Sequence, residues 1–196
     1  GIEFNSDGPK KYEGEFEEGK RHGKGVSFRE DGSKMYDGEW GNGKRHGKGI
    51  EFSPEGSKLY EGEFKEGEFH GHGTLFDSDG FKLYEGEFQN SKRHGHGTYF
   101  LQDGSKKYEG GFKDGKRHGH GISYHVNGEV EFDGEWNDDA KDEEATTRKR
   151  ARETYIKLCC SMPGFPELPV CPICLEVMVE GDEISAYSTC GHRVCS

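Results

Sequence analysis

Aromatic and polar residues alternate along the first two thirds of the chain, in a short segment that recurs every 24 residues. The segment reads Tyr-x-Gly-x-Phe or Tyr-x-Gly-x-Trp, as from Tyr12 to Phe16, and its intervening positions are mostly glutamate. An alternation of period two places the rings and the glycine on one face of a β-strand and the glutamates on the other. The tyrosines follow one another without a slip, with Phe132 in the last place: Tyr12, Tyr36, Tyr60, Tyr84 and Tyr108. A fixed period of this length predicts a repeat protein.

A glycine-rich segment follows each predicted strand. It has the form Gly-Lys-Arg-His-Gly-Lys/His-Gly and is complete at residues 19–25, 43–49 and 115–121. Glycine adopts backbone conformations that other residues rarely reach, so we expect this segment to be the turn of a hairpin, with Val26 and Phe28 in the second strand. One hairpin is marginal in water, and we therefore expect hairpins to stack into one sheet, with rings of the adjacent repeat over each glycine.

The composition excludes a large aliphatic core. Hydrophobic residues make up 29% of the chain, aromatic residues 12%, and 32 residues are glycine. A core built from this composition has to be shallow, repetitive and aromatic. The net charge of −11 argues against nucleic acid as a partner. No apolar run approaches the roughly 20 residues that a membrane-spanning helix needs.

The repeated motif resembles the MORN repeat, most closely at Tyr36-Asp37-Gly38-Glu39-Trp40 with Gly47 and Gly49. The resemblance covers residues 1–139. It implies a mostly β chain with an elongated single-layer antiparallel sheet of stacked hairpins, used for protein contacts, self-association or attachment to a membrane surface. Three departures interrupt the pattern: Gly111 replaces a glutamate, Ser91 replaces a turn glycine, and Glu68-Phe69 replaces a basic pair.

The glycine-rich segments also carry a candidate binding edge. Stacked hairpins would place their Lys-Arg pairs in one row, which could bind anionic lipid headgroups or an acidic protein, each cation contributing about 1 kcal/mol. The alternative is a solvated row of turns that binds nothing. The residues of this candidate basic rim are Lys20, Arg21, Lys44, Arg45, Lys92, Arg93, Lys116 and Arg117. Protonation of the neighbouring histidines would strengthen it. We expect those histidines to tie down the turns rather than to bind a metal: His22, His46, His70, His94 and His118.

The repeats give way to a charged segment. The last copy lacks the glycine-rich segment at residues 137–141, which predicts a terminal cap without a turn. Residues 138–156 are acidic first and basic later, an order that suits the dipole of a helix. We therefore expect a charged helical linker over residues 140–160.

The cysteines are confined to the end of the chain. None of the six precedes Cys159, so the repeats have no disulfide framework, and a Cys/His cluster in a chain of this kind indicates a metal site. The candidate ligands are Cys171, Cys174, Cys190, His192 and Cys195. Paired thiolates and an imidazole at short spacing suit tetrahedral zinc. We expect zinc to be the cofactor of a small domain at residues 161–196.

This cluster resembles the first five ligands of a RING finger. The resemblance implies recruitment of a ubiquitin-conjugating enzyme through Ile173 and Leu175, with no catalytic residues of the chain's own. RING ligands interleave, so Cys171, Cys174 and Cys195 would share one zinc with a cysteine after Ser196. The chain also starts halfway through a repeat, because residues 1–4 align with residues 49–52. We expect the natural protein to continue at both ends.

Together these features predict a repeat scaffold joined to a RING-type finger, acting as a ubiquitin ligase toward a substrate that the sequence does not identify. The alternative is a non-enzymatic scaffold whose finger only binds protein. We expect a cytoplasmic protein, peripheral at a membrane or cytoskeletal assembly.

Overall fold

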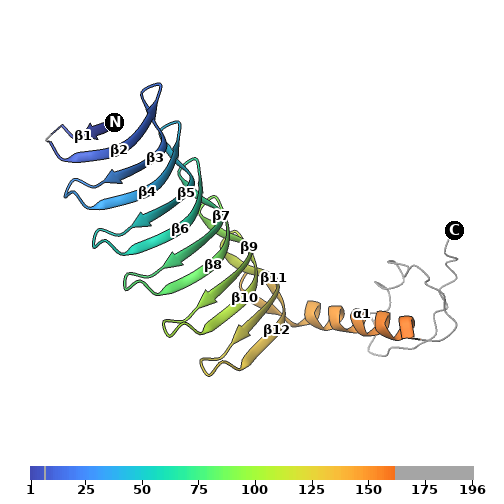
Figure 1. Ribbon diagram of the computed structural model, residues 1–196. Helices are drawn as coiled ribbons and strands as arrows, with labels where there is room; N and C mark the ends of the chain where they lie inside the picture. Colours follow the sequence, from blue (N-terminus) through green and yellow to red (C-terminus); the bar gives the residue numbers. More distant parts are fainter. Residues whose placement is uncertain (7, 162–196) are drawn as a thin grey trace, which may run out of the picture. The chain divides into compact units, whose positions relative to one another are not determined.

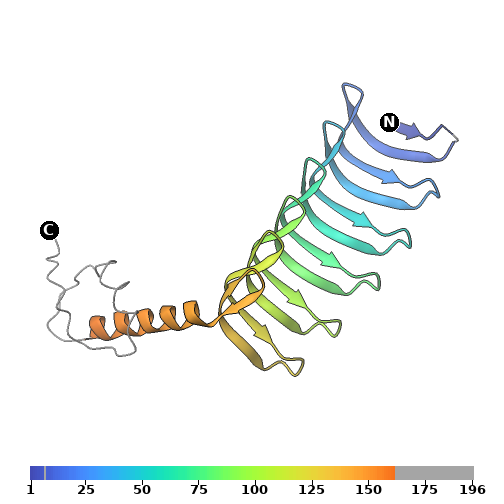
Figure 2. The ribbon, with the colours of Figure 1, turned by 180° about the vertical axis from the view of Figure 1, so that it is seen from behind.

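Within the residues that the structure describes, the chain forms one antiparallel sheet of 13 strands, followed by one helix (Figure 1). This computed structural model describes residues 1–6 and 8–161, so the candidate zinc ligands lie outside the described residues. Each strand is hydrogen-bonded to the next strand along the chain, and the view from behind shows the same order (Figure 2). The strands are β1 Ile2–Phe4, β2 Lys10–Glu17, β3 Lys20–Phe28, β4 Lys34–Gly41, β5 Lys44–Phe52, β6 Lys58–Lys65, β7 Glu68–Phe76, β8 Lys82–Gln89, β9 Lys92–Phe100, β10 Lys106–Lys113, β11 Lys116–Tyr124, β12 Val130–Asn137 and β13 Ala140–Asp142. The prediction of a mostly β chain with a single antiparallel sheet is confirmed.

The turns are shorter than the sequence suggested. The prediction that residues 19–25 form a turn is wrong, because β3 already begins at Lys20. Glu18 and Gly19 alone make the turn, with φ of 49° and 75°, and two successive positive φ values are what a tight hairpin turn requires. Gly23 also has a positive φ, 56°, but it forms a bulge within β3, where the pairing with β2 shifts register after Gly14.

The last repeat keeps its turn. Asp138 and Asp139 have φ of 49° and 72°, and the Asp139 N–H donates to Arg117 O at 3.0 Å, as the Gly115 N–H donates to Arg93 O at 2.9 Å. The prediction of a terminal copy without a turn is therefore wrong. Aspartate visits the left-handed region more readily than most residues, so a turn without glycine still forms.

The helix α1 spans Glu143–Ser161. The helix expected over residues 140–160 starts only at Glu143, because residues 138–142 complete the last hairpin. Asp142 caps the helix: its Oδ1 accepts the N–H of Ala145 at 2.8 Å. Glu143 and Glu144 follow in the first turn, where negative charge is favourable.

The core lies on one face of the sheet, which we call the aromatic face and define by Tyr12, Tyr36, Tyr60, Tyr84 and Tyr108. Tyr60 has no exposed surface, and its ring meets Phe64 and Phe88 edge to face at 5.1 and 5.3 Å between centroids. Similar contacts form an unbroken series from Phe16 to Trp136. A single layer of strands thus obtains a continuous core from rings alone.

Glycines make room for these rings. They pair across neighbouring strands in one unbroken row: Gly14, Gly25, Gly38, Gly49, Gly62, Gly73, Gly86, Gly97, Gly110, Gly121 and Gly134. A Cβ on Gly73 would overlap the Tyr60 hydroxyl, which donates to Glu63 O at 2.9 Å. The ring over each glycine pair therefore belongs to the same repeat, not to the adjacent repeat as predicted.

Candidate binding surfaces of the sheet

The two residues of each Lys-Arg pair point to different faces. Lys20 and Arg21 are consecutive in β3, so their side chains leave the sheet on opposite sides. The lysines are exposed on the face away from the tyrosines, which we call the opposite face: Lys20, Lys44, Lys92 and Lys116. Lys44 pairs with Glu66 at 2.9 Å, and Lys116 pairs with Asp138 at 3.2 Å. Acidic groups near the hairpin turns thus neutralise part of this row.

The arginines of the candidate basic rim cover the core. Arg21, Arg45, Arg93 and Arg117 are half-buried, and each guanidinium lies within 6 Å of at least two ring centroids. Arg117 is closest, at 4.0 Å from the centroid of Trp136. A cation over a ring face is attracted by the ring's quadrupole. The structure does not bring the eight cations together as one row, and binding of an anionic surface to them stays a prediction.

Three of these arginines also pair with a carboxylate. Arg21 pairs with Glu3 at 2.9 Å, Arg45 with Glu51 at 2.8 Å and Arg117 with Asp139 at 3.0 Å. Arg93 instead donates to a backbone carbonyl, Gly115 O, at 2.8 Å. Among the described residues, Arg93 has no carboxylate within ion-pair distance. We did not predict this difference between Arg93 and the other three arginines, although the residue types at the positions beside each arginine show it.

The third repeat has a ring where the others have an arginine. Phe69 stacks flat on Tyr60, with centroids 3.8 Å apart and an interplanar angle of 10°. Phe69 and Leu75 are both half-buried and pack against the core. The middle of the aromatic face is therefore less charged than its ends.

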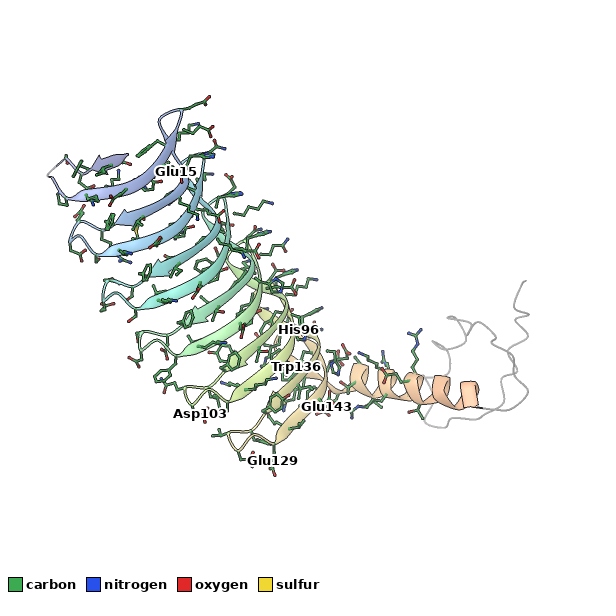
Figure 3. The ribbon with its side chains drawn as sticks, viewed as in Figure 1. Glu15, His96, Asp103, Glu129, Trp136 and Glu143 are labelled. Atoms are coloured by element: carbon green, nitrogen blue, oxygen red, sulfur yellow. The ribbon has the colours of Figure 1, made fainter. Side chains whose placement is uncertain are left out.

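The opposite face is lined with ion pairs. Each repeat has a lysine that bonds an acidic residue three positions later: Lys10–Glu13, Lys34–Asp37, Lys58–Glu61, Lys82–Glu85 and Lys106–Glu109. Half-buried rings stand beside them at Phe28, Phe52, Phe76, Phe100 and Tyr124. Figure 3 shows Asp103 and Glu129 at the loops that join successive repeats along one long edge. Both signs of charge alternate over this face, so it has no single-sign field.

The histidines lie on the opposite face or close to the turns. His22 Nδ1 is 3.1 Å from a Glu17 oxygen, and His120 Nε2 is 3.0 Å from an oxygen of Asp133. In the part of the chain that the structure describes, no three His, Cys, Asp or Glu side chains converge as metal ligands would. The repeated histidines are thus spread along the sheet.

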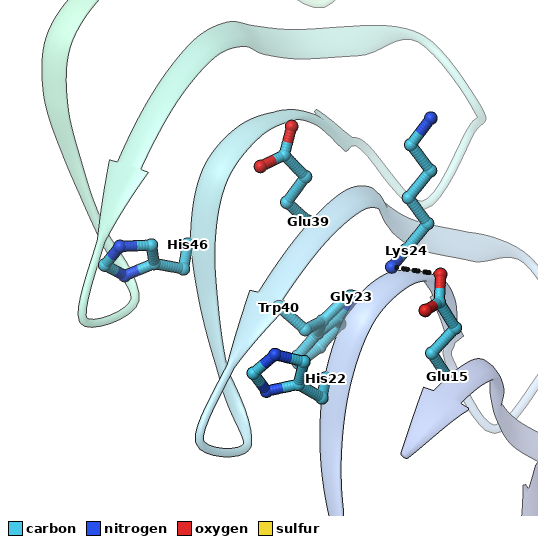
Figure 4. A pocket seen from close by; sticks show the side chains of 7 residues that line it. All are labelled: Glu15, His22, Gly23, Lys24, Glu39, Trp40 and His46. Atoms are coloured by element: carbon cyan, nitrogen blue, oxygen red, sulfur yellow. Dashed lines mark hydrogen bonds between the residues drawn. The ribbon is translucent and has the colours of Figure 1, made fainter. Parts of the chain in front are cut away.

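A shallow hollow of about 350 Å³ opens beside the first bulge (Figure 4). It is lined by Glu15, His22, Gly23, Lys24, Glu39, Trp40 and His46. Glu15 Oε1 accepts the N–H of Lys24 at 3.0 Å, which ties the bulge to β2. Glu63 and Glu87 accept the N–H of His72 and His96 in the same way. The same register shift recurs in the hairpins of the next four repeats.

The core tyrosines are neutral structural groups. Burial raises the pKa of Tyr36, Tyr60 and Tyr84 well above the ordinary value, and it raises the pKa of Tyr108 to about 12. Each hydroxyl donates to a backbone carbonyl three residues later, as Tyr108 does to Gly111 O at 3.0 Å. Each of these hydroxyls is thus hydrogen-bonded within its own strand.

Comparison with known proteins agrees with this repeat structure. The family model for the MORN repeat matches residues 12–34, 36–58, 60–81, 84–106 and 108–130, so each match begins at a core tyrosine. No curated protein matches the chain. Within the described residues, no helix combines the length and the apolar character that crossing a membrane would require.

Proposed function

Because the chain belongs to the MORN repeat family, whose repeats serve as scaffolds that bind proteins or membranes, we propose that the sheet from Ile2 to Asp142 is a scaffold that binds a protein partner. The observation that carries this proposal is the surface of the sheet itself. It is a single layer with two accessible faces, and both faces combine half-buried apolar side chains with charges of both signs. Mixed apolar and polar surface of this kind is typical of protein interfaces.

A protein partner fits the charges better than an anionic membrane does. Attraction to a membrane needs a cluster of unpaired cations within a Debye length of the lipid. Here the arginines lie over aromatic rings, two of the four lysines are paired, and the whole chain has a net charge of −11. Anionic lipid would therefore be repelled by the chain as a whole and attracted only weakly by its turns.

Binding to synthetic peptides and to vesicles separates the two partners. We expect peptides selected from a random library to bind the purified chain with a measurable Kd. Vesicles that contain phosphatidylserine should retain no more chain than neutral vesicles do at pH 7.4 or 5.5. The proposal is overturned if no peptide is selected and anionic vesicles retain the chain, with retention lost after Lys20, Lys44, Lys92 and Lys116 are changed to glutamate.

We further propose that the chain's last segment binds zinc and recruits a ubiquitin-conjugating enzyme, so that the scaffold presents a substrate for ubiquitin transfer. The support is the donor set, because Cys171, Cys174, Cys190, His192 and Cys195 supply the thiolates and the imidazole that zinc prefers. Zinc would supply folding energy to this segment. Ile173 and Leu175 would form the contact with the conjugating enzyme.

Two measurements test this second proposal. We expect the purified chain to contain zinc, and we expect Cys171→Ala together with Cys174→Ala to lower the zinc content. In the full-length protein, Ile173→Ala should abolish ubiquitin transfer while zinc content and fold remain. A full-length protein that contains zinc but transfers no ubiquitin argues for the alternative of a finger that only binds protein. Transfer at the normal rate by a zinc-loaded Ile173→Ala protein would show that Ile173 does not form the contact with the conjugating enzyme. A full-length protein purified without zinc from zinc-containing medium rules out both.

A further inference from the structure

One position on the aromatic face carries a different type of residue in different repeats. The residues in question lie between the core tyrosines of neighbouring strands, and Glu3 and Glu51 both occupy this position beside Tyr12 and Tyr36. Each of these carboxylates is held by cations. Glu3 forms ion pairs with Arg21 at 2.9 Å and with Lys11 at 3.0 Å, and Glu51 forms one with Arg45 at 2.8 Å. The sheet thus uses an internal carboxylate to neutralise the cations around it.

Tyr99 occupies the same position, between Tyr84 and Tyr108, and its side chain has no carboxylate. The cations are nevertheless present. The Arg93 guanidinium lies 5.7 Å from the Tyr99 ring centroid, and Lys107 Nζ also lies 5.7 Å from it. Relative to Tyr99, Arg93 stands where Arg45 stands relative to Glu51, and Lys107 stands where Lys11 stands relative to Glu3. Neither cation has a carboxylate within ion-pair distance among the described residues.

Apolar side chains lie on the same face as Tyr99, on strand β7. Leu75 occupies the equivalent position on the side of β8 away from Tyr99, because both β7 and β9 pair with β8. Phe69, in the same strand as Leu75, stacks on Tyr60, and the side chains of Phe69 and Leu75 are half-buried and pack against the core. Half-exposed apolar side chains beside two cations form a surface of mixed character, unlike the ion-paired ends of the same face.

We propose that Arg93 and Lys107 bind an acidic side chain of a partner protein above the ring of Tyr99, with an adjacent apolar side chain of that partner resting on Leu75 and Phe69. This inference rests on the proposed function and names its binding surface. The partner's carboxylate takes the role that Glu3 and Glu51 play elsewhere in the sheet. A charge-assisted hydrogen bond from a guanidinium or an ammonium to a carboxylate is stronger than a neutral one, and the ring and the leucine exclude water around it.

A pair of synthetic peptides tests the charge requirement. The probe is fluorescein-labelled Gly-Leu-Glu-Leu-Glu-Gly, and its counterpart carries glutamine in place of both glutamates. We expect fluorescence anisotropy to show binding of the glutamate peptide to the full chain, about tenfold tighter than that of the glutamine peptide. Equal binding of the two peptides, or no binding of the glutamate peptide at millimolar concentration, overturns the proposal.

Tyr99→Glu is the sharpest variant, because the sheet itself carries glutamate at this position in two other repeats. The introduced carboxylate should pair with Arg93 and Lys107 and should weaken binding of the glutamate peptide about tenfold or more. Because the variant loses the ring of Tyr99, which packs against the core, a thermal unfolding transition must show that the variant is still folded. Lys107→Ala should also weaken binding of the glutamate peptide. Lys106→Ala is the matched control, since it removes the same charge one residue away on the opposite face, where Lys106 pairs with Glu109.

These outcomes separate the surface from the general function. Undiminished peptide binding by Tyr99→Glu overturns the surface assigned here. The scaffold proposal then still stands if other peptides selected from the random library bind the chain. If no peptide of any kind binds, both fail together.

Discussion

The two faces of the sheet have different roles. On the aromatic face, Tyr60 and its counterparts are almost completely buried, and every ring touches its neighbours. On the opposite face, Lys58 and Glu61 form an exposed ion pair that recurs in each of five repeats. Exposed pairs contribute little to stability, whereas buried rings contribute much. The comparison indicates that one face holds the fold together and that the other keeps it dispersed in water.

Alkaline pH should destabilise the fold by deprotonating the tyrosines of the aromatic face. This is the largest loss of stability that we expect. Burial raises the pKa of Tyr108 from 10.0 to about 12. The unfolded chain therefore loses this proton at a lower pH than the folded chain does. The stability linked to the proton is complete below about pH 10 and is lost as pH rises toward 12. The other core tyrosines shift in the same direction, so their effects add.

Urea unfolding of the full chain, followed by circular dichroism at a series of pH values, measures this loss. Stability should fall steeply above about pH 10, and Tyr108→Phe should make the fall less steep because one titrating group is gone. An unchanged urea midpoint between about pH 8 and pH 12 would show that the hydroxyls are not protected by the fold.

The glycine row should be the next most sensitive feature. In Gly62→Ala, the new Cβ would lie 2.5 Å from the Gly73 Cα and 2.6 Å from His72 O, both of which are backbone atoms. The strands would have to separate, and overpacking of this kind costs about 3 kcal/mol. Glu61→Ala, the adjacent residue on the opposite face, is the control. If the two variants unfold at the same urea concentration, the aromatic face has no special role.

A pair of neighbouring cations compares the faces directly. Arg45 contacts the ring of Phe64 at 5.2 Å and bonds to Glu51 and to Gly67 O, both at 2.8 Å. Lys44 points the other way and pairs with Glu66, where both side chains are more than half exposed. Arg45→Ala should lower the free energy of unfolding by about 1–2 kcal/mol, and Lys44→Ala should leave it unchanged. A larger loss in Lys44→Ala would reverse the comparison.

The sequence was sufficient for the architecture but not for the direction of individual side chains. The 24-residue period and the tyrosine spacing predicted the stacked hairpins and the aromatic core correctly, because the alternation of a strand is visible in the residues themselves. The face on which Arg21 lies depends on where the turn ends. An offset of one residue moves a side chain to the other face, so treating residues 19–25 as a turn placed Arg21 in one row with Lys20, whereas the two side chains lie on opposite faces.

The bulge at Gly23 added to this difficulty. A glycine with positive φ serves a turn and a bulge equally well, and only the pairing with β2 distinguishes them. The contrast between Glu51 and Tyr99 was visible in the sequence as a difference between repeats. Its meaning depended on knowing that Arg45 and Arg93 lie on the aromatic face beside those positions.

Removing a carboxylate that ties a bulge should have the smallest effect. Glu87 Oε1 accepts the N–H of His96 at 2.9 Å on the opposite face. The fifth repeat shows what happens without this bond, because Gly111 replaces the glutamate and yet Gly119 keeps a positive φ of 71°. The bulge therefore forms from backbone pairing alone, and the carboxylate adds only the modest free energy of a partly exposed hydrogen bond. Glu87→Ala should lower the free energy of unfolding by about 0.5 kcal/mol, measured in urea beside Arg45→Ala. A loss as large as that of Gly62→Ala would mean that the opposite face also holds the fold together, and the division between the two faces would have to be abandoned.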